Sequence, residues 1–318
     1  MPTSALPKGS ILIAPHQFPD LTREKELAAR FGLDLVVARD QGHFASSIAG
    51  ANVVMVTPYA QVGRAEIDSM KHCRGIVRYG IGYDNIDVAC AVQAGVPVSV
   101  VPDASVEEVA SHAFALGLSL IRRIPAGQAA ISAGKWAGAV PADLPVLSQV
   151  RVGVIGMGRI GRHVAHWWDA VGAKVSAHDP VAQFNDVRQA SLNELITQSD
   201  VLSLHIPLTP ETHHLVSSKT IAQMPRGSVI VNVSRGGLID EQALARALNE
   251  GHIAGAGIDV FETEPLPLEH PLRTAPNTIL TPHAAWKSRS SLSALQAGAV
   301  ERAEAFLEGK QPRDLVTG

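Results

Sequence analysis

The chain has 318 residues, 46% of them hydrophobic and 18% charged, and a formal net charge of −3. This length allows two domains with separate hydrophobic cores, and the composition is typical of a folded globular chain. The near-neutral charge offers no basic surface for nucleic acid or anionic lipid. The longest apolar stretch, 113–121, is too short to span a bilayer, and the N-terminus has no signal-peptide pattern. Cys73 and Cys90 cannot form a disulfide framework, so we expect a cytoplasmic protein without nucleic-acid or membrane partners.

The first hundred residues alternate between short β-rich runs and helix-like segments. The runs are Ser10–Ala14, Asp34–Ala38, Asn52–Thr57, Gly75–Tyr79 and Val96–Val101, and the helix-like segments include Thr22–Phe31, Arg64–Met70 and Asp87–Ala94. This alternation predicts parallel strands joined by right-handed crossovers, and so a doubly wound α/β domain. The region contains no glycine fingerprint.

The segment after Pro102 changes in character. Ser105-Val106-Glu107-Glu108 has the form of a capping box and predicts a long helix to about Arg123. The Gly- and Ala-rich stretch 125–145 has poor periodicity, which favours an extended arm. Because such arms often embrace a second subunit, we expect a homodimer through it.

A second α/β domain follows from Arg151. Its predicted strands are Arg151–Ile155, Lys174–His178, Val201–His205, Ser228–Val233, Gly255–Asp259 and Ile279–Thr281. The last predicted helix, Ser290–Leu307, lies beyond this domain and would return to complete the first one. The fold class expected is therefore α/β, with two doubly wound parallel-sheet domains.

Gly156, Gly158 and Gly161 form a G-x-G-x-x-G pattern between a predicted strand and a predicted helix. A dinucleotide-binding loop needs this context, because the glycines allow a tight turn, a close approach to pyrophosphate and packing of helix on strand. A tight turn without any ligand would give the same pattern. Asp179 closes the next strand, where a ribose-binding carboxylate belongs, and it would repel a 2′-phosphate. We therefore expect NAD rather than NADP.

Three polar residues follow predicted strands of the second domain: Arg235, Glu264 and His283. A guanidinium can bind a carboxylate or a polarised carbonyl oxygen, and a histidine can transfer a proton near neutral pH. Glu264 could fix the imidazole tautomer and stabilise the imidazolium. Taken singly, each residue also fits a surface or structural role.

Two histidine pairs have a spacing that metal sites use: His213-His214, and His163 with His166. No cysteine or carboxylate cluster joins either pair in the sequence. We therefore expect no metal.

Six ordered motifs make nearly the whole chain resemble the D-isomer-specific 2-hydroxyacid dehydrogenases. They are Arg78-Tyr79-Gly80-Ile81-Gly82-Tyr83-Asp84-Asn85-Ile86-Asp87, the glycine loop, Leu204-His205-Ile206-Pro207-Leu208-Thr209, Asn232-Val233-Ser234-Arg235-Gly236-Gly237-Leu238-Ile239-Asp240-Glu241, Asp259-Val260-Phe261 with Glu264-Pro265-Leu266, and Thr281-Pro282-His283. The resemblance implies a Rossmann NAD-binding domain (102–287) inserted into a flavodoxin-like substrate domain (1–101 and 288–318).

The resemblance also implies a reaction, the interconversion of a D-2-hydroxy acid and its 2-oxo acid by hydride transfer. His283 would be the acid/base, Glu264 would orient it, and Arg235 would bind the substrate carboxylate and oxo group. The implied substrate-binding residues are Arg78, Gly80, Ile81, Gly82 and Trp286. The implied cofactor-binding residues are Gly156, Gly158, Arg159, Ile160, Gly161, Asp179, His205, Pro207, Thr212, Val233 and Asp259.

The motifs also bear on the branch of the family. Phosphoglycerate dehydrogenases commonly carry an arginine–serine pair where this chain has Val56-Thr57-Pro58-Tyr59, and many add a C-terminal regulatory domain. Residues 101–108 and 282–288 resemble the C-terminal-binding-protein branch, where the residue matching Trp286 lines the substrate pocket. An NAD(H)-sensing binding protein of that type is the alternative function. Glyoxylate, hydroxypyruvate, phosphoglycerate and a bulkier 2-oxo acid all stay open as substrates.

Overall fold

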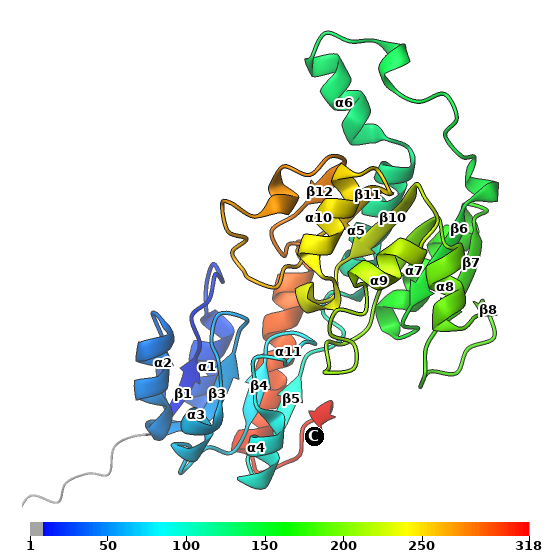
Figure 1. Cartoon of the computed structure of the whole chain (residues 1–318). Coiled ribbons are helices and arrows are strands. Elements are labelled where there is room, and N and C mark those ends of the chain that lie inside the picture. The colour runs from blue at the N-terminus through cyan, green and yellow to red at the C-terminus, as the bar shows by residue number, and fades with distance from the viewer. Residues whose placement is uncertain (1–8, 318) are drawn as a thin grey trace, which may run out of the picture. The chain divides into compact units, whose positions relative to one another are not determined.

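The computed structural model describes residues 9–317, which divide into two compact units (Figure 1). The first unit contains residues 9–105 and 287–317, and the second contains residues 106–286. Each unit is built around one largely parallel sheet with helices packed on it. The predicted fold class, two doubly wound α/β domains, is confirmed.

The first unit has a six-stranded sheet in the order β13-β5-β4-β3-β1-β2, in which only the β13–β5 pair is antiparallel. The parallel part has the flavodoxin-like order 2-1-3-4-5. Helix α11 comes from the end of the chain and packs on α1, β3 and β4. The elements are β1 (Ser10–Ile13), α1 (Thr22–Arg30), β2 (Asp34–Val37), α2 (Gln41–Ser47), β3 (Ala51–Val56), α3 (Arg64–Asp68), β4 (Ile76–Arg78), α4 (Val88–Gln93), β5 (Val98–Val100), α11 (Ser291–Leu307) and β13 (Leu315–Val316).

The second unit has a seven-stranded parallel sheet in the order β12-β11-β10-β9-β6-β7-β8. Counted within the unit, its first six strands have the 3-2-1-4-5-6 order of Rossmann folds. Its elements are α5 (Val106–Ile121), α6 (Ile124–Ser132), β6 (Arg151–Ile155), α7 (Arg159–Ala170), β7 (Lys174–His178), β8 (Arg188–Gln189), α8 (Leu192–Gln198), β9 (Val201–Leu204), α9 (Ser218–Gln223), β10 (Ser228–Asn232), α10 (Glu241–Asn249), β11 (Ile253–Ile258) and β12 (Thr278–Leu280).

The strands β9, β10 and β11 of the second unit are buried on both faces, as near-continuous apolar runs require. Helices α5 and α7 form one hydrophobic core with β6, β9 and β10. Residues of α8, α9 and α10 form a second core on the same sheet. These two cores fix the strand ends, and the loops that carry the polar candidates leave from those ends.

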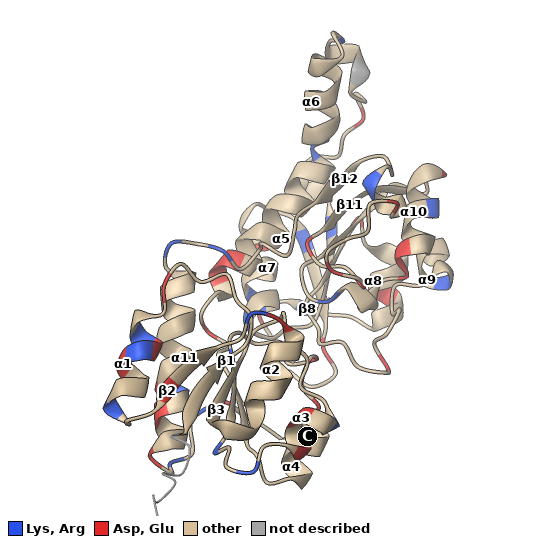
Figure 2. Cartoon of the chain, turned by 90° about the vertical axis from the view of Figure 1, so that its left-hand side faces the viewer, with Lys and Arg blue, Asp and Glu red and all other residues tan. Residues whose placement is uncertain are grey.

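The expectation of an extended arm at 125–145 is partly wrong, because α6 occupies Ile124–Ser132. Alanine favours helix even where no face is buried, and none of the residues of α6 is buried. In Figure 2, α6 stands away from the sheet of its unit and carries no charged residue. Within residues 9–317, no helix is both long and apolar enough to cross a membrane.

Candidate active site

Predicted site residues follow five parallel strands of the second unit. β6 leads into Gly156, β9 into His205, β10 into Arg235, β11 into Asp259 and β12 into His283. Because the carboxyl ends of parallel strands meet at one edge of the sheet, this edge is where ligands bind in such folds. The structure therefore brings residues that are widely separated in sequence to one edge.

The glycines of the loop differ in whether the fold leaves room for a side chain. A Cβ on Gly156, where φ is +97°, would lie 2.2 Å from the carbonyl oxygen of His205, and a Cβ on Gly161 would lie 1.9 Å from that of Gly156. A Cβ on Gly158 would meet nothing within 4 Å. Gly158 is the N-cap of α7, and no side chain caps this helix. The space above Gly158 therefore lies at a helix N-terminus, where backbone N–H groups bind phosphate, and the loop fits a pyrophosphate.

Asp179 lies next to this loop. Its carboxylate accepts hydrogen bonds from the backbone N–H groups of Met157 (2.7 Å), Val181 (2.8 Å) and Ala182 (2.8 Å). Partial burial alone would raise the pKa of Asp179, but these three bonds together hold it below its ordinary value. Asp179 is thus an anion fixed beside the helix N-terminus, where it can accept from ribose hydroxyls.

His205 and Thr212 shape the loop after β9. Nε2 of His205 bonds Ser203 Oγ at 2.8 Å, while its buried Nδ1 has no partner in the structure. Burial lowers the pKa of His205 to about 3, so the ring is neutral near pH 7. The Thr212 hydroxyl donates to the Pro207 carbonyl (2.8 Å) and accepts from the N–H of Thr209 (2.7 Å). These bonds close the loop on itself.

Asp259 organises the loop that carries His283. Its side chain is 1% exposed and accepts hydrogen bonds from the Thr281 hydroxyl (2.5 Å) and the N–H groups of Ala284 (2.9 Å) and Ala285 (3.0 Å). Its backbone carbonyl accepts from the N–H of His283 (2.8 Å). A buried carboxylate with this many donors is a rigid anchor. The loop therefore holds His283 in the left-handed region, with φ at +50°.

His283 and Glu264 form a direct pair. Nδ1 of His283 lies 2.8 Å from Oε2 of Glu264, and Oε1 of Glu264 accepts from the N–H of Phe261 at 3.0 Å. Burial by itself would raise the pKa of Glu264, but the bond and charge of His283, the Phe261 N–H and the charge of Arg235 lower it. Glu264 is therefore an anion at neutral pH. Since Glu264 occupies Nδ1, Nε2 of His283 is the nitrogen left for a substrate.

Arg235 follows β10 on a backbone that its neighbours hold. Asn232 Nδ2 donates to the Arg235 carbonyl (2.8 Å), and the Ser234 hydroxyl donates to the Leu204 carbonyl (2.8 Å). The half-buried guanidinium bonds the Ser234 carbonyl through Nη1 (2.6 Å). Its charge acts on Glu264, so the structure brings Arg235, Glu264 and His283 into one electrostatic environment. Trp286 lies beside them, and its Nε1 donates to the carbonyl of His283 at 3.0 Å.

The other predicted substrate residues belong to the first unit. Arg78 ends β4, is 7% exposed, and bonds the Tyr79 carbonyl through Nη1. Gly80 has φ at +118°, a conformation that favours glycine, and Ile81 after it is 46% exposed. Arg78 thus lies under a turn that presents Ile81 and Gly82 to solvent.

Sequence reasoning missed three residues of this edge. Thr281 bridges Asp259 to His112 of α5, whose Nε2 lies 3.0 Å from the Thr281 hydroxyl. Glu262 contacts His214 at 2.5 Å, so the expectation that no carboxylate joins the His213-His214 pair is wrong. No spacing in the sequence signals the last contact, because it joins residues 48 positions apart.

Comparisons with known proteins agree with this geometry. The sequence profile of the D-isomer specific 2-hydroxyacid dehydrogenase NAD binding domain matches residues 114–285. A glyoxylate reductase from Korarchaeum cryptofilum is 38% identical over 251 residues, which are 76% of each chain. A hydroxypyruvate reductase from Blautia hydrogenotrophica is 36% identical over 85% of this chain and 86% of its own.

Solved structures give the same result for both units. The D-lactate dehydrogenase from Aquifex aeolicus, complexed with NAD and lactic acid, matches 94% of this chain and 96% of its own with a TM-score of 0.85 and 29% identity. The chain belongs to the D-isomer specific 2-hydroxyacid dehydrogenase family and is an NAD-dependent oxidoreductase that acts on a CH–OH group.

Proposed function

We propose that this enzyme interconverts a small 2-oxo acid and its D-2-hydroxy acid, with His283 as the acid/base, Glu264 orienting it and Arg235 binding the carboxylate and oxo group. The observation that carries the proposal is the 2.8 Å His283–Glu264 pair next to the charge of Arg235. Reduction of a carbonyl needs an oriented general acid that can place a proton on the oxo oxygen. It also needs a cation that stabilises the negative charge developing there.

The three side chains divide the work of the reduction. Bound NADH supplies the hydride to the carbonyl carbon. Negative charge then grows on the oxo oxygen, and the guanidinium of Arg235 stabilises it while binding the carboxylate. His283 donates the proton from Nε2, because Nδ1 is bonded to Glu264. The Glu264 carboxylate stabilises the imidazolium before transfer and fixes its orientation. In the oxidation, Nε2 takes the proton back.

We assign the second unit to the cofactor and the first to the substrate. The cofactor residues are Gly156, Gly158, Arg159, Ile160, Gly161, Asp179, His205, Pro207, Thr212, Val233 and Asp259. The space above Gly158 supports a pyrophosphate there, and the fixed anion of Asp179 supports a ribose without a 2′-phosphate. A kcat/KM with NADPH comparable to that with NADH would contradict the preference for NAD.

The proposed substrate residues are Arg78, Gly80, Ile81, Gly82 and Trp286. The turn over Arg78 supports binding of a carboxylate by backbone N–H groups, and the indole of Trp286 supports an apolar side chain. Glyoxylate and hydroxypyruvate are the first substrates to try, because the two relatives above are reductases of these acids.

The test is NADH oxidation across a panel of 2-oxo acids: glyoxylate, hydroxypyruvate, phosphohydroxypyruvate and a branched-chain acid. We expect at least one acid to give turnover that His283→Ala removes. If no acid gives turnover above the His283→Ala background while NADH still binds, the alternative gains: an NAD(H)-sensing binding protein of the C-terminal-binding-protein type.

We further propose a cytoplasmic homodimer that forms through the segment 125–145 and its flanks. Exposed apolar side chains support this interface: Ile124 is 58% exposed, Ile131 55%, Trp136 80% and Val146 54%. Trp136→Ser with Ile131→Ser should shift the solution mass toward the monomer. A wild-type mass that stays monomeric at all concentrations would refute the dimer.

The free thiols of Cys73 and Cys90 fit a reducing compartment.

A further inference from the structure

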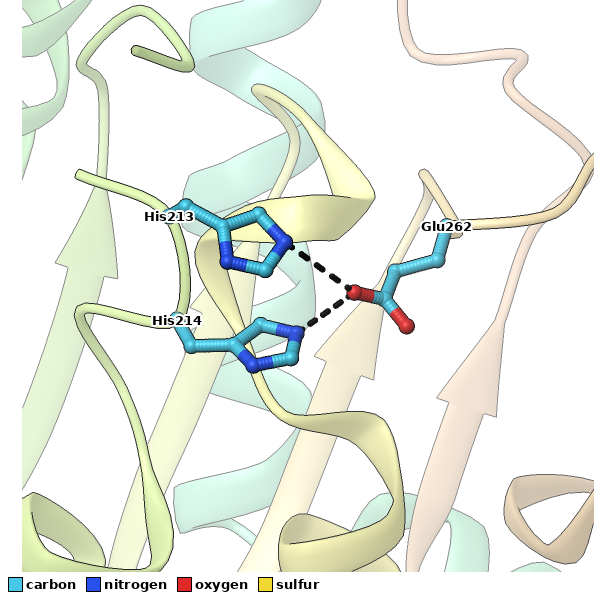
Figure 3. A group of neighbouring side chains, drawn as sticks. All are labelled: His213, His214 and Glu262. Atoms are coloured by element: carbon cyan, nitrogen blue, oxygen red, sulfur yellow. Dashed lines mark hydrogen bonds and ion pairs between the residues drawn. The ribbon is translucent and has the colours of Figure 1, made fainter. Parts of the chain in front are cut away.

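A cluster of two imidazoles and one carboxylate lies on the second unit and has no role in the proposed reaction. His213 and His214 come from the loop after β9, and Glu262 comes from the loop after β11 (Figure 3). Nε2 of His214 lies 2.5 Å from Oε1 of Glu262, and Nε2 of His213 lies 3.8 Å from the same oxygen. Within residues 9–317, this is the one group of three such residues whose ligand atoms all lie within 4.8 Å.

The backbone places both imidazoles on the same side. His213 and His214 lie in a turn in which His214 has φ at +49°, and their rings stack. The ring centroids lie 4.0 Å apart with an interplanar angle of 25°. The N–H of His214 donates to the Gly237 carbonyl at 2.8 Å, which holds this conformation.

The third ligand is anchored to the same turn. A Cβ on Gly236 would lie 1.9 Å from the carbonyl carbon of Phe261, so glycine lets the Phe261–Glu262 backbone contact the turn to which His214 is bonded. The N–H of Glu262 donates to Oε1 of the buried Glu241 at 2.9 Å. The three ligand residues are thus fixed relative to one another by backbone contacts before any ion binds.

The charges around the cluster favour a cation. Besides Glu262, two acidic side chains lie nearby: the buried Glu241, whose Oε1 accepts from the N–H of Glu262 at 2.9 Å, and Glu264, two residues further along the same loop. The Nε2 atoms of His213 and His214 face the same oxygen of Glu262. A divalent ion bound by these two nitrogens and this oxygen would offset the acidic charge.

We propose that His213, His214 and Glu262 form a binding site for a divalent transition-metal ion of the zinc class, with one coordination position open to water. Two imidazole nitrogens and a carboxylate oxygen are a ligand set that Zn²⁺ accepts, and harder ions such as Mg²⁺ prefer all-oxygen sites. With bonds of about 2.0 Å, tetrahedral ligand atoms lie roughly 3.3 Å apart, so binding requires the 3.8 Å separation to shorten and the 2.5 Å separation to lengthen by less than about 1 Å each.

The decisive experiment is a titration of tag-free, chelator-treated protein with Zn²⁺ by calorimetry, and with Co²⁺ by visible absorption. We expect one ion per chain with a dissociation constant of about 1–10 µM, a Co²⁺ spectrum typical of a four-coordinate ion, and a higher Tm with Zn²⁺. His213→Ala and Glu262→Gln should each weaken binding about 100-fold. Both should keep wild-type turnover.

The chain offers matched controls. His163 and His166 form another histidine pair of the second unit, on α7, and the double variant His163→Ala/His166→Ala should bind Zn²⁺ as wild type does. Loss of binding in His283→Ala instead would place the ion on the proposed acid/base and overturn the proposal. Absence of saturable binding in wild type, or binding that His213→Ala and Glu262→Gln leave unchanged, would also overturn it.

Discussion

Two imidazole–carboxylate pairs of this enzyme take their carboxylates from one loop, the loop after β11, and their dimensions hardly differ. His283–Glu264 is 2.8 Å long with side-chain exposures of 33% and 36%, and His214–Glu262 is 2.5 Å long with exposures of 35% and 38%. Both histidines are in the left-handed region, with φ at +50° and +49°. Neither distance, burial nor backbone conformation therefore distinguishes the proposed catalytic pair from its neighbour.

The difference lies in what surrounds each pair. The second oxygen of Glu264 accepts a hydrogen bond from the Phe261 N–H, and the charge of Arg235 helps to lower the pKa of Glu264. Glu264 is therefore an anion with a single imidazole partner. Glu262 directs one oxygen toward two imidazoles and lies over the buried acid Glu241. The first arrangement is suited to moving a proton, and the second to holding a cation. We therefore assign the two pairs different roles on the basis of their neighbours rather than of their own dimensions.

The sharpest way to break this comparison is to remove each imidazole. We expect His283→Ala to lower kcat/KM for 2-oxo acid reduction about 10³-fold, because general acid catalysis contributes about 10²–10⁴-fold. His214→Ala should change it less than about threefold. Both are measured by NADH absorbance at a fixed pH. Equal losses in the two variants would show that the pairs are not functionally distinct.

Removing each carboxylate charge should give a smaller contrast. Glu264→Gln should lower kcat/KM about 10–100-fold, because the amide no longer stabilises the imidazolium. Glu262→Gln should keep kcat/KM within about threefold of wild type. A wild-type kcat/KM in Glu264→Gln would contradict the orienting role of this residue.

The anchor of the His283 loop can be tested through stability. Asp259→Asn should lower the free energy of unfolding by about 1–3 kcal/mol. The NH₂ group of the amide cannot accept a hydrogen bond, so at least one of the donors Thr281, Ala284 and Ala285 would lose its partner. Urea denaturation measures this change. Glu262→Gln, on an exposed side chain, should stay within about 0.5 kcal/mol of wild type. If Asp259→Asn is equally mild, the loop is held in another way.

The smallest effect should appear in how the free energy of unfolding depends on pH. The folded-state pKa of Glu264 is below its ordinary value of 4.5, so its contribution is complete above pH 4.5 and is lost as pH falls through the lowered pKa. The pKa of Glu241 is raised, so its cost is present at neutral pH and is relieved as pH falls toward 4.5. Each effect should stay within about 1 kcal/mol. Unfolding at several pH values, with Glu264→Gln and Glu241→Gln, separates them.

The sequence predicts most of the sheets because apolar runs bounded by turn residues are a local signal. β6 and β7 coincide with the predicted strands, Arg151–Ile155 and Lys174–His178. Helix α2 was missed, because Gln41–Ser47 is short and buries only Phe44. Helix α6 was missed because it buries no face, and periodicity detects only faces.

The candidate site divides in the same way. Arg235 and His283 could be selected because each follows a strand end, and strand ends are local features. The contact of Glu262 with His214 spans 48 residues and depends on the close approach that Gly236 allows. No periodicity or spacing in the sequence encodes that approach, so the second pair required the structure.

The open space above Gly158 means that substitutions in the glycine loop fall into two classes, those that disturb folding and those that disturb cofactor binding. Side chains at positions 156 and 161 would collide with the protein's own backbone, so changes there report on folding. A methyl group at position 158 would collide with no atom of the described chain. Gly158→Ala should therefore fold normally but bind the dinucleotide weakly. Such a variant would give a cofactor-blind form of this enzyme, against which every effect of NADH on shape, assembly or metal content can be compared.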